Sequence, residues 1–470
     1  MNNEQNIYSD VITTNQEQSN SNTNPENFMK TFDYENVAIT DIVNIVIIDS
    51  IDKKASDIHF NPTEDGIIIR IRIDGELRNY AKVPGYVKKN MITRVKILAG
   101  MNITESRVPQ DGAIKQTIQD KDVDLRVSSL PTKMGENIVV RILDYTMSSQ
   151  GIDTLGFNET NLKKLIKMIE QPNGIILVTG ATGSGKSTTV YSILQRLNTI
   201  DRNIITVEDP IEMNIPGVNQ VQVISDIGLT FAASLRSILR QDPDIIMIGE
   251  IRDDETARIA VRASITGHLV LSTIHTNSAL NTIERLLDMN IERYLLGTAL
   301  TGIISQKLCK KLCPYCRGTR ATTPYEKNVF KNSLNLDINE IYEAKGCDKC
   351  HEGYKGRMAI HEVLMLNQEI RDAITNNLDK DNLRDLVYGT GTITMLQDGL
   401  TKVINGDTTF EELVKAIDID DTDLTSKGLS ESLEIAEKNK DVLKDNANYK
   451  KIVEKNDTDY EVFDLDFLNK

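Results

Sequence analysis

The chain has 470 residues, a length typical of two or three domains. Its net charge of −15 is uneven: residues 1–36 carry −5, residues 417–470 carry −7, and the 380 residues between them carry only −3. This distribution argues against a protein that binds nucleic acid through a general positive surface.

The two ends differ in composition from the rest of the chain. Residues 1–36 are rich in Asn, Gln, Ser and Thr and are predicted to form a disordered tail, without the basic and apolar regions of a signal peptide. Residues 417–470 are predicted to form an acidic extension, either a partner-docking motif or a solvated segment. Because no apolar run approaches the length of a membrane span, no transmembrane segment and a cytoplasmic location are predicted.

A small α/β domain is predicted for residues 37–147. Apolar residues at helical spacing predict helices within 37–55 and 86–101, the second ending at Gly100. Alternating runs around and after the second helix predict short strands. Tight turns are predicted at three Asp-Gly pairs, which occupy positions 65–66, 74–75 and 111–112.

A second α/β domain, with a mostly parallel and doubly wound sheet, is predicted for residues 148–416. A helix that ends before Pro172 opens it, and apolar strands then alternate with helical stretches. The predicted strands include GIILVTG at 174–180, RNIITVED at 202–209, DIIMIGE at 244–250 and HLVLSTI at 268–274.

The strongest motif is GATGSGKST at residues 180–188, which follows an apolar strand and opens a helix. The motif predicts a P-loop, in which backbone N–H groups surround phosphate, Lys186 contacts the β- and γ-phosphates, and the Ser187 hydroxyl ligates Mg²⁺. ATP is the expected ligand. The predicted binding residues are Gly180, Gly183, Ser184, Gly185, Lys186, Ser187 and Thr188.

Two further strand ends carry acids, Glu208 in IITVEDP and Glu250 in DIIMIGE. Because ligands bind at the carboxyl ends of strands in doubly wound sheets, both carboxylates are expected near the phosphates. His275 ends another strand, and contact with a γ-phosphate or water is expected there. His268 stands before that strand, and for it a structural role is as good an interpretation as a catalytic one.

These motifs together resemble one family, the hexameric ATPases of type II secretion and type IV pilus assembly. GATGSGKST resembles its Walker A motif, IITVEDPIE its Asp box, LRSILRQDPDIIMIGEIRD its Walker B region and TGHLVLSTIHTNSA its His box. The resemblance extends from about Ala38 to Ala416. It implies a RecA-like P-loop ATPase domain, a smaller PAS-like domain before it, and a ring of six subunits.

The resemblance also implies roles for single residues. Glu250 would serve Mg²⁺ and water, and Glu208 is a candidate general base, although the two carboxylates could exchange these roles. Arg126 and Arg141 match the arginines that the smaller domain supplies to the phosphates. Ala113 is a departure, because the family usually has arginine at that position.

Five cysteines gather in residues 309–351, which we interpret as an insert in the ATPase domain. In a cytoplasmic chain a disulfide framework is not expected, and two Cys-x-x-Cys pairs are typical of structural Zn²⁺. Free thiols packed as small apolar groups are the alternative. Cys309 and His351 fall outside the pairs. The predicted zinc ligands are Cys313, Cys316, Cys347 and Cys350.

The resemblance is closest to the pilus-assembly branch and implies a motor that polymerises pilin subunits, contacted indirectly, at an inner-membrane platform protein. It places the chain in the cytoplasm, recruited to the membrane surface. Because the resemblance begins near Ala38, docking through the extra N-terminal domain of many assembly ATPases is not carried over.

Two alternative enzyme functions remain open: a type II secretion ATPase and a nucleic-acid translocase. The second is disfavoured by the balanced core charge and the absence of Trp, so no direct nucleic-acid partner is expected. A nucleotide-binding regulator without turnover is a third, disfavoured by Lys186 and both carboxylates.

Overall fold

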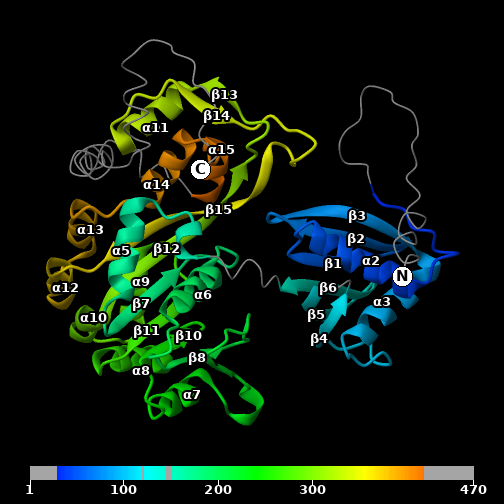
Figure 1. Cartoon of the computed structure of the whole chain (residues 1–470), viewed down its shortest axis with the longest axis horizontal. Coiled ribbons are helices and arrows are strands. Elements are labelled where there is room, and N and C mark those ends of the chain that lie inside the picture. The colour runs from blue at the N-terminus through cyan, green and yellow to red at the C-terminus, as the bar shows by residue number, and fades with distance from the viewer. Residues whose placement is uncertain (1–28, 119–120, 144–150, 418–470) are drawn as a thin grey trace. The chain divides into compact units, whose positions relative to one another are not determined.

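The computed structural model describes residues 29–118, 121–143 and 151–417, which form two compact units that divide between Thr146 and Met147 (Figure 1). The predictions for residues 1–28 and 418–470 lie outside the described residues. Residues 29–36, which we expected to belong to the N-terminal tail, are part of the first unit, and Phe32 is buried in its core. None of the described helices is long and apolar enough to cross a bilayer.

The described part of the first unit has an antiparallel sheet in the order β3-β2-β1-β6-β5-β4, with two helices that contact each other. Alternation along β2 buries Ile67, Ile69 and Ile71 in the unit's core. The elements are α2 (Ile39–Asp52), β1 (Asp57–Thr63), β2 (Gly66–Ile73), β3 (Glu76–Pro84), α3 (Gly85–Leu98), β4 (Gln110–Ile118), β5 (Lys121–Thr132) and β6 (Gly135–Leu143).

One predicted turn is wrong. The Asp-Gly pairs at 65–66 and 74–75 connect β1 to β2 and β2 to β3, but Asp111 and Gly112 lie inside β4. A Cβ atom on Gly112 would lie 2.2 Å from the carbonyl oxygen of Ala99. Gly112 therefore permits close packing of β4 against the end of α3 and does not form a turn.

The second unit has a seven-stranded sheet in the order β15-β12-β7-β11-β10-β8-β9. Its described elements up to the end of this sheet's parallel part are α5 (Glu159–Ile169), β7 (Gly174–Thr179), α6 (Lys186–Leu197), β8 (Ile204–Glu208), β9 (Asn219–Gln222), α7 (Phe231–Ile238), β10 (Ile245–Ile248), α8 (Asp254–Ile265), β11 (Leu269–Ile274), α9 (Ala279–Asp288), α10 (Arg293–Ala299) and β12 (Leu300–Leu312). After β12 come β13 (Gly318–Ala321), α11 (Pro324–Leu334), β14 (Glu340–Glu343), β15 (Tyr354–Met365), α12 (Gln368–Thr375), α13 (Lys380–Gly389), α14 (Met395–Ile404) and α15 (Phe410–Ala416).

Six of these strands, β12, β7, β11, β10, β8 and β9, pair in parallel with their neighbours. Among the described strands of this sheet, the β12–β15 pair alone is antiparallel. Every residue of β7, β8, β10 and β11 is buried, because helices cover both faces of the sheet. Parallel pairing brings the carboxyl ends of these strands to one edge. The predicted fold class, a P-loop-type α/β domain preceded by a smaller α/β domain, is confirmed.

The insert with the cysteines forms a small module at one end of the second unit (Figure 1). Strands β13 and β14 pair with each other, and α11 packs with α14 and α15 around Phe330 and Leu400. Cys309 lies in this apolar cluster at 2% exposure, and burial raises the pKa of its thiol to about 12. Cys309 therefore behaves as a small apolar side chain.

His361 on β15 is completely buried, and neither ring nitrogen has a hydrogen-bond partner among the described residues. Its ring stacks on Phe157, with the centroids 3.8 Å apart. Burial, with a smaller contribution from the charge of Lys402, holds the pKa of His361 well below its usual value. His361 is therefore neutral in the folded protein and contributes two uncompensated buried polar atoms.

Replacing His361 with leucine should stabilise the protein by about 1 kcal/mol, because losing the unpartnered nitrogens gains about 1–3 kcal/mol and losing the ring stacking costs about 0.5–1.5 kcal/mol. The gain should be larger in acid. Below about pH 6.5 the unfolded chain takes up a proton at His361 and the folded chain does not, so the wild type loses stability there. Thermal melting at about pH 7.5 and about pH 5.5 measures both effects. A variant that melts no higher than wild type at either pH would contradict this account.

Candidate active site and tetracysteine cluster

The P-loop connects β7 to α6 as the motif predicts, with Lys186 as the first residue of the helix. Gly183 and Gly185 have φ angles of 79° and 88°, a conformation that side chains with a Cβ rarely adopt. These angles let the loop turn back on itself at the amino end of α6. The loop therefore has the shape in which N–H groups and a helix amino end face one anion.

Two polar side chains of the loop fit a phosphate group. The hydroxyl of Ser184 is buried and has no hydrogen-bond partner within the described residues. Lys186 donates from Nζ to the carbonyl oxygens of Gly180 and Ala181, at 3.0 and 3.1 Å. Burial lowers the pKa of Lys186, and the charge of Glu250 opposes this effect. Both side chains thus offer donors that a phosphate oxygen would satisfy better than the loop does.

Glu250 follows β10 and forms the centre of a charged cluster. Arg252 donates a hydrogen bond to Oε1, and Nε2 of His275 lies 3.4 Å from Oε2. Partial burial raises the pKa of the Glu250 carboxyl, but the hydrogen bond and charge of Arg252, with the charges of His275 and Lys186, outweigh it. The pKa of Glu250 is therefore lowered overall, and the carboxylate stays ionised near Lys186.

Glu208, the last residue of β8, has a different environment. It is 3% exposed, and Tyr191 donates a hydrogen bond to Oε2. Its Oε1 accepts hydrogen bonds from Thr206, at 2.6 Å, and Gln220, at 3.1 Å. Both oxygens of Glu208 therefore bind side chains of α6, β8 and β9, whereas the side chain of Glu250 is 16% exposed and lies beside His275.

The two histidines that flank β11 have different environments. His275, half-exposed at the carboxyl end of the strand, belongs to the Glu250 cluster. Nδ1 of His268 lies 2.9 Å from the carbonyl oxygen of Ala263 at the end of α8, near the opposite edge of the sheet. This position favours the structural interpretation of His268.

Arg126 and Arg141 lie in the first unit, directly opposite each other on β5 and β6. Nε of Arg141 is 3.2 Å from Oδ1 of Asp57, and the Arg141 side chain is 65% exposed. Aligned positions on five neighbouring strands form a row across the sheet. In strand order the row consists of Ala113, Arg126, Arg141, Asp57 and Arg72.

The four predicted metal ligands come together in the structure. Their sulfur atoms all lie within 4.8 Å of one another, with 3.9 Å between Cys313 and Cys347 and 3.6 Å between Cys316 and Cys350. Tetrahedral Zn²⁺ at about 2.3 Å from each sulfur requires sulfur separations of about 3.8 Å. The cluster therefore has the dimensions of a zinc site.

Sequence reasoning missed several residues that hold this site together. Tyr191 on α6 contacts Glu208, and Gln306 on β12 contacts the P-loop over a separation of 122 residues in the chain. Neither belongs to a motif, so no local pattern points to it. Arg252 had a signal, because it stands two residues after Glu250 in the charged EIRD stretch.

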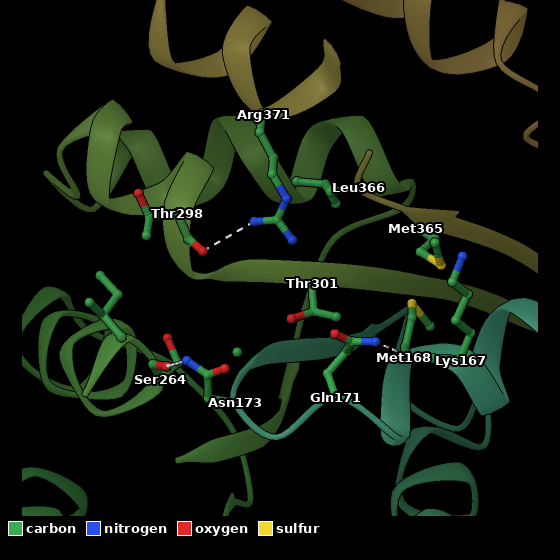
Figure 2. Close-up of a pocket in the computed structure, with 12 residues that line it drawn as sticks. Lys167, Met168, Gln171, Asn173, Ser264, Thr298, Thr301, Met365, Leu366 and Arg371 are labelled. Carbon is green, nitrogen blue, oxygen red and sulfur yellow. Dashed lines mark hydrogen bonds between the residues drawn. The ribbon is translucent and has the colours of Figure 1, made fainter. Parts of the chain in front are cut away.

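A pocket of 370 Å³ lies beside the amino ends of β7 and β12, with Gly174 and Thr301 in its lining (Figure 2). None of the predicted site residues lines it. Arg371 points into this region, but it donates to the carbonyl oxygens of Gly297 and Thr298, at 2.8 and 3.1 Å. These carbonyls belong to the end of α10, so Arg371 caps that helix.

Comparison with known proteins agrees with this geometry. Residues 33–415 match the family model described as "Type II/IV secretion system protein". The chain belongs to this family. It is 46% identical to the putative type II secretion system protein E of Escherichia coli (strain K12), over 80% of this chain and 76% of that protein. It is 44% identical to the type IV pilus assembly ATPase PilB of Myxococcus xanthus (strain DK1622), over 81% of this chain and 68% of that protein.

Among solved structures, the chain resembles the pilus retraction motor PilT with bound ADP. The TM-score is 0.58, with 27% identity over 81% of this chain and 98% of that one. Membership in the family, together with the intact P-loop, confirms the predicted class of enzyme: the chain is a secretion or pilus ATPase.

Proposed function

We propose that the chain is a hexameric motor that hydrolyses ATP at the P-loop edge of the second unit and drives pilin polymerisation in type IV pilus assembly. One observation carries the hydrolysis proposal: Lys186, Glu250 and His275 come from three separate strand ends and interact at one edge of the sheet. This is the edge at which doubly wound sheets bind ligands.

The residues divide the work as follows. The P-loop N–H groups and Lys186 bind and orient the phosphates, and their positive potential stabilises charge on the transferred phosphoryl group. Ser187 and Glu250 would hold Mg²⁺, whose charge would neutralise phosphate oxygens. We assign activation of water to Glu250 because it is partly exposed beside His275. Glu208, with both oxygens engaged, is assigned to positioning β8 against α6.

Arg126 and Arg141 are proposed to contact phosphate oxygens, as the family resemblance implies. Arginine suits this role because its charge is permanent and its planar fork matches two oxygens. Their aligned places on β5 and β6, with Arg141 largely exposed, support the proposal. Ala113, opposite Arg126 on β4, stands where the family usually has arginine, so the row holds three arginines instead of four.

We propose that the cysteine cluster holds one structural Zn²⁺ per chain, and we predict about one zinc per polypeptide in protein purified without chelator. Cys347→Ser should remove the metal and lower the melting temperature, because a structural zinc site contributes folding energy. Cys309→Ser is the matched control, since that thiol lies outside the cluster and should leave the zinc content unchanged. Elemental analysis of the three proteins measures this, and zinc-free wild-type protein would refute the assignment.

Type II secretion is the second candidate system, favoured by the 46% identity to the Escherichia coli relative. A chromosomal Lys186→Ala allele in the source organism separates the two systems. Loss of surface pili with intact protein secretion supports pilus assembly. Loss of secretion with intact pili supports the second candidate, and loss of neither rejects both.

A further inference from the structure

Gln306 has no place in the mechanism so far, but it lies against the P-loop. Strand β12 pairs in parallel with β7 up to Ser305 and Thr179, and Gln306 is the next residue. At that point β7 ends and the chain turns into the P-loop. Gln306 is 1% exposed, so its polar side chain must find partners inside the protein.

Both ends of the Gln306 amide are engaged by the nucleotide-binding segment. Nε2 donates to the carbonyl oxygen of Ser184 at 2.7 Å, and Oε1 accepts from the hydroxyl of Thr189 at 2.8 Å. Ser184 is in the loop and Thr189 is in the first turn of α6. One side chain therefore connects the loop to the helix that it precedes.

The fit around Gln306 is also close. A Cβ atom on Gly180 would lie 2.4 Å from the backbone oxygen of Gln306, and one on Gly185 would lie 3.1 Å from its Nε2. The absence of a Cβ atom at Gly180 and Gly185 therefore leaves room for Gln306, in addition to allowing the turn of the loop. The contact therefore depends both on the glycines of the loop and on Gln306 of β12.

The direction of the Ser184 carbonyl explains what this contact does. In a trans peptide the C=O and the following N–H point in opposite directions. Because Gln306 holds the Ser184 oxygen toward β12, the N–H of Gly185 points away from β12. An N–H in that direction is one of the donors with which a P-loop binds phosphate.

We propose that Gln306 is a positioning residue for ATP hydrolysis. It fixes the Ser184–Gly185 peptide and the first turn of α6, so the phosphate-binding N–H groups are oriented before the nucleotide arrives. This inference rests on the proposed nucleotide site. Without the amide, the peptide is free to rotate, and ordering it again weakens nucleotide binding.

The test compares Gln306→Met with Gln397→Leu. Met retains the length and apolar volume of glutamine but neither hydrogen bond. Gln397 is a matched control, because it is also buried and also donates to a backbone carbonyl, that of Ser333 at 3.0 Å, while its side-chain amide bonds Ser333 and Thr394 and not the P-loop. Thr189→Val removes only the contact with Oε1 and provides a second variant if Gln306→Met does not fold.

The measurements are the Kd of ADP by calorimetry, kcat and KM for Mg-ATP, and the melting temperature. Gln306→Met should weaken ADP binding about 10-fold and lower kcat, and Thr189→Val should have the same effect to a smaller degree. Gln397→Leu should lower only the melting temperature. A folded Gln306→Met protein with wild-type Kd and kcat, or, if it does not fold, a Thr189→Val protein with wild-type values, would overturn the proposal. Wild-type protein that does not bind ADP would instead refute the nucleotide site itself.

Discussion

Lys186→Ala should lower the ATPase rate by about 10²–10³-fold, because it removes the positive charge that stabilises the transferred phosphoryl group. The fold should survive. Within the described part of the chain, the Lys186 side chain makes two hydrogen bonds, both to carbonyls of its own loop, and it carries the cost of burial that lowers its pKa. Phosphate release at saturating Mg-ATP measures the rate, and the melting temperature reports the fold.

Lys163→Ala is the matched control for this variant. Lys163 is an exposed lysine on α5 whose ion pair is with Glu159, one turn earlier on the same helix. An exposed pair of this kind contributes little to stability, so both turnover and melting should match wild type. Normal turnover in Lys186→Ala would mean that hydrolysis takes place elsewhere in the chain.

Glu250→Gln should lower kcat by about 10²–10⁴-fold while nucleotide still binds, because the amide is close in shape but cannot take a proton from water. The ionised state of Glu250 is what the substitution removes, since Arg252 and His275 hold its pKa below the usual value. Rapid-quench measurement of a single turnover, with binding of a fluorescent ATP analogue measured separately, distinguishes lost chemistry from lost binding.

Glu208→Gln tests the division of roles between the two carboxylates. Because Glu208 is buried and bonded to Tyr191, Thr206 and Gln220, its substitution should lower the melting temperature more than Glu250→Gln does and turnover less. The opposite ranking, with Glu208→Gln inactive and Glu250→Gln active, would transfer the general-base role to Glu208.

Four parallel strands of the second unit, β7, β8, β10 and β11, could be predicted because they are buried on both faces. Such strands have nearly continuous apolar sequences, and β7, β10 and β11 have that form. Strand β15 has no such signal. It buries His361 and Glu362, residues that a pattern places at the surface, because contacts from distant segments surround them. Glu362, for example, accepts hydrogen bonds from the Ala279 N–H and the Tyr388 hydroxyl.

In the candidate site, too, some residues could be predicted from the sequence and others could not. The P-loop is contiguous, so its residue types and its place between a strand and a helix predict the phosphate contacts together. The partners that hold it are remote in the chain, as Gln306 is from Ser184. The difference between Glu208 and Glu250 could not be predicted either. Both stand at the ends of apolar strands, and the packing of Tyr191 and Gln220 against Glu208 distinguishes the two carboxylates.

The measurement that tests the central claim most directly is phosphate release by the purified wild-type chain with Mg-ATP, in the absence and presence of DNA or RNA. The family membership and the site geometry predict steady turnover that nucleic acid leaves unchanged, since the residues between the two acidic ends are nearly neutral in net charge. No turnover, with ADP shown to bind, or turnover only when nucleic acid is added, would contradict a secretion or pilus motor that hydrolyses ATP at this P-loop.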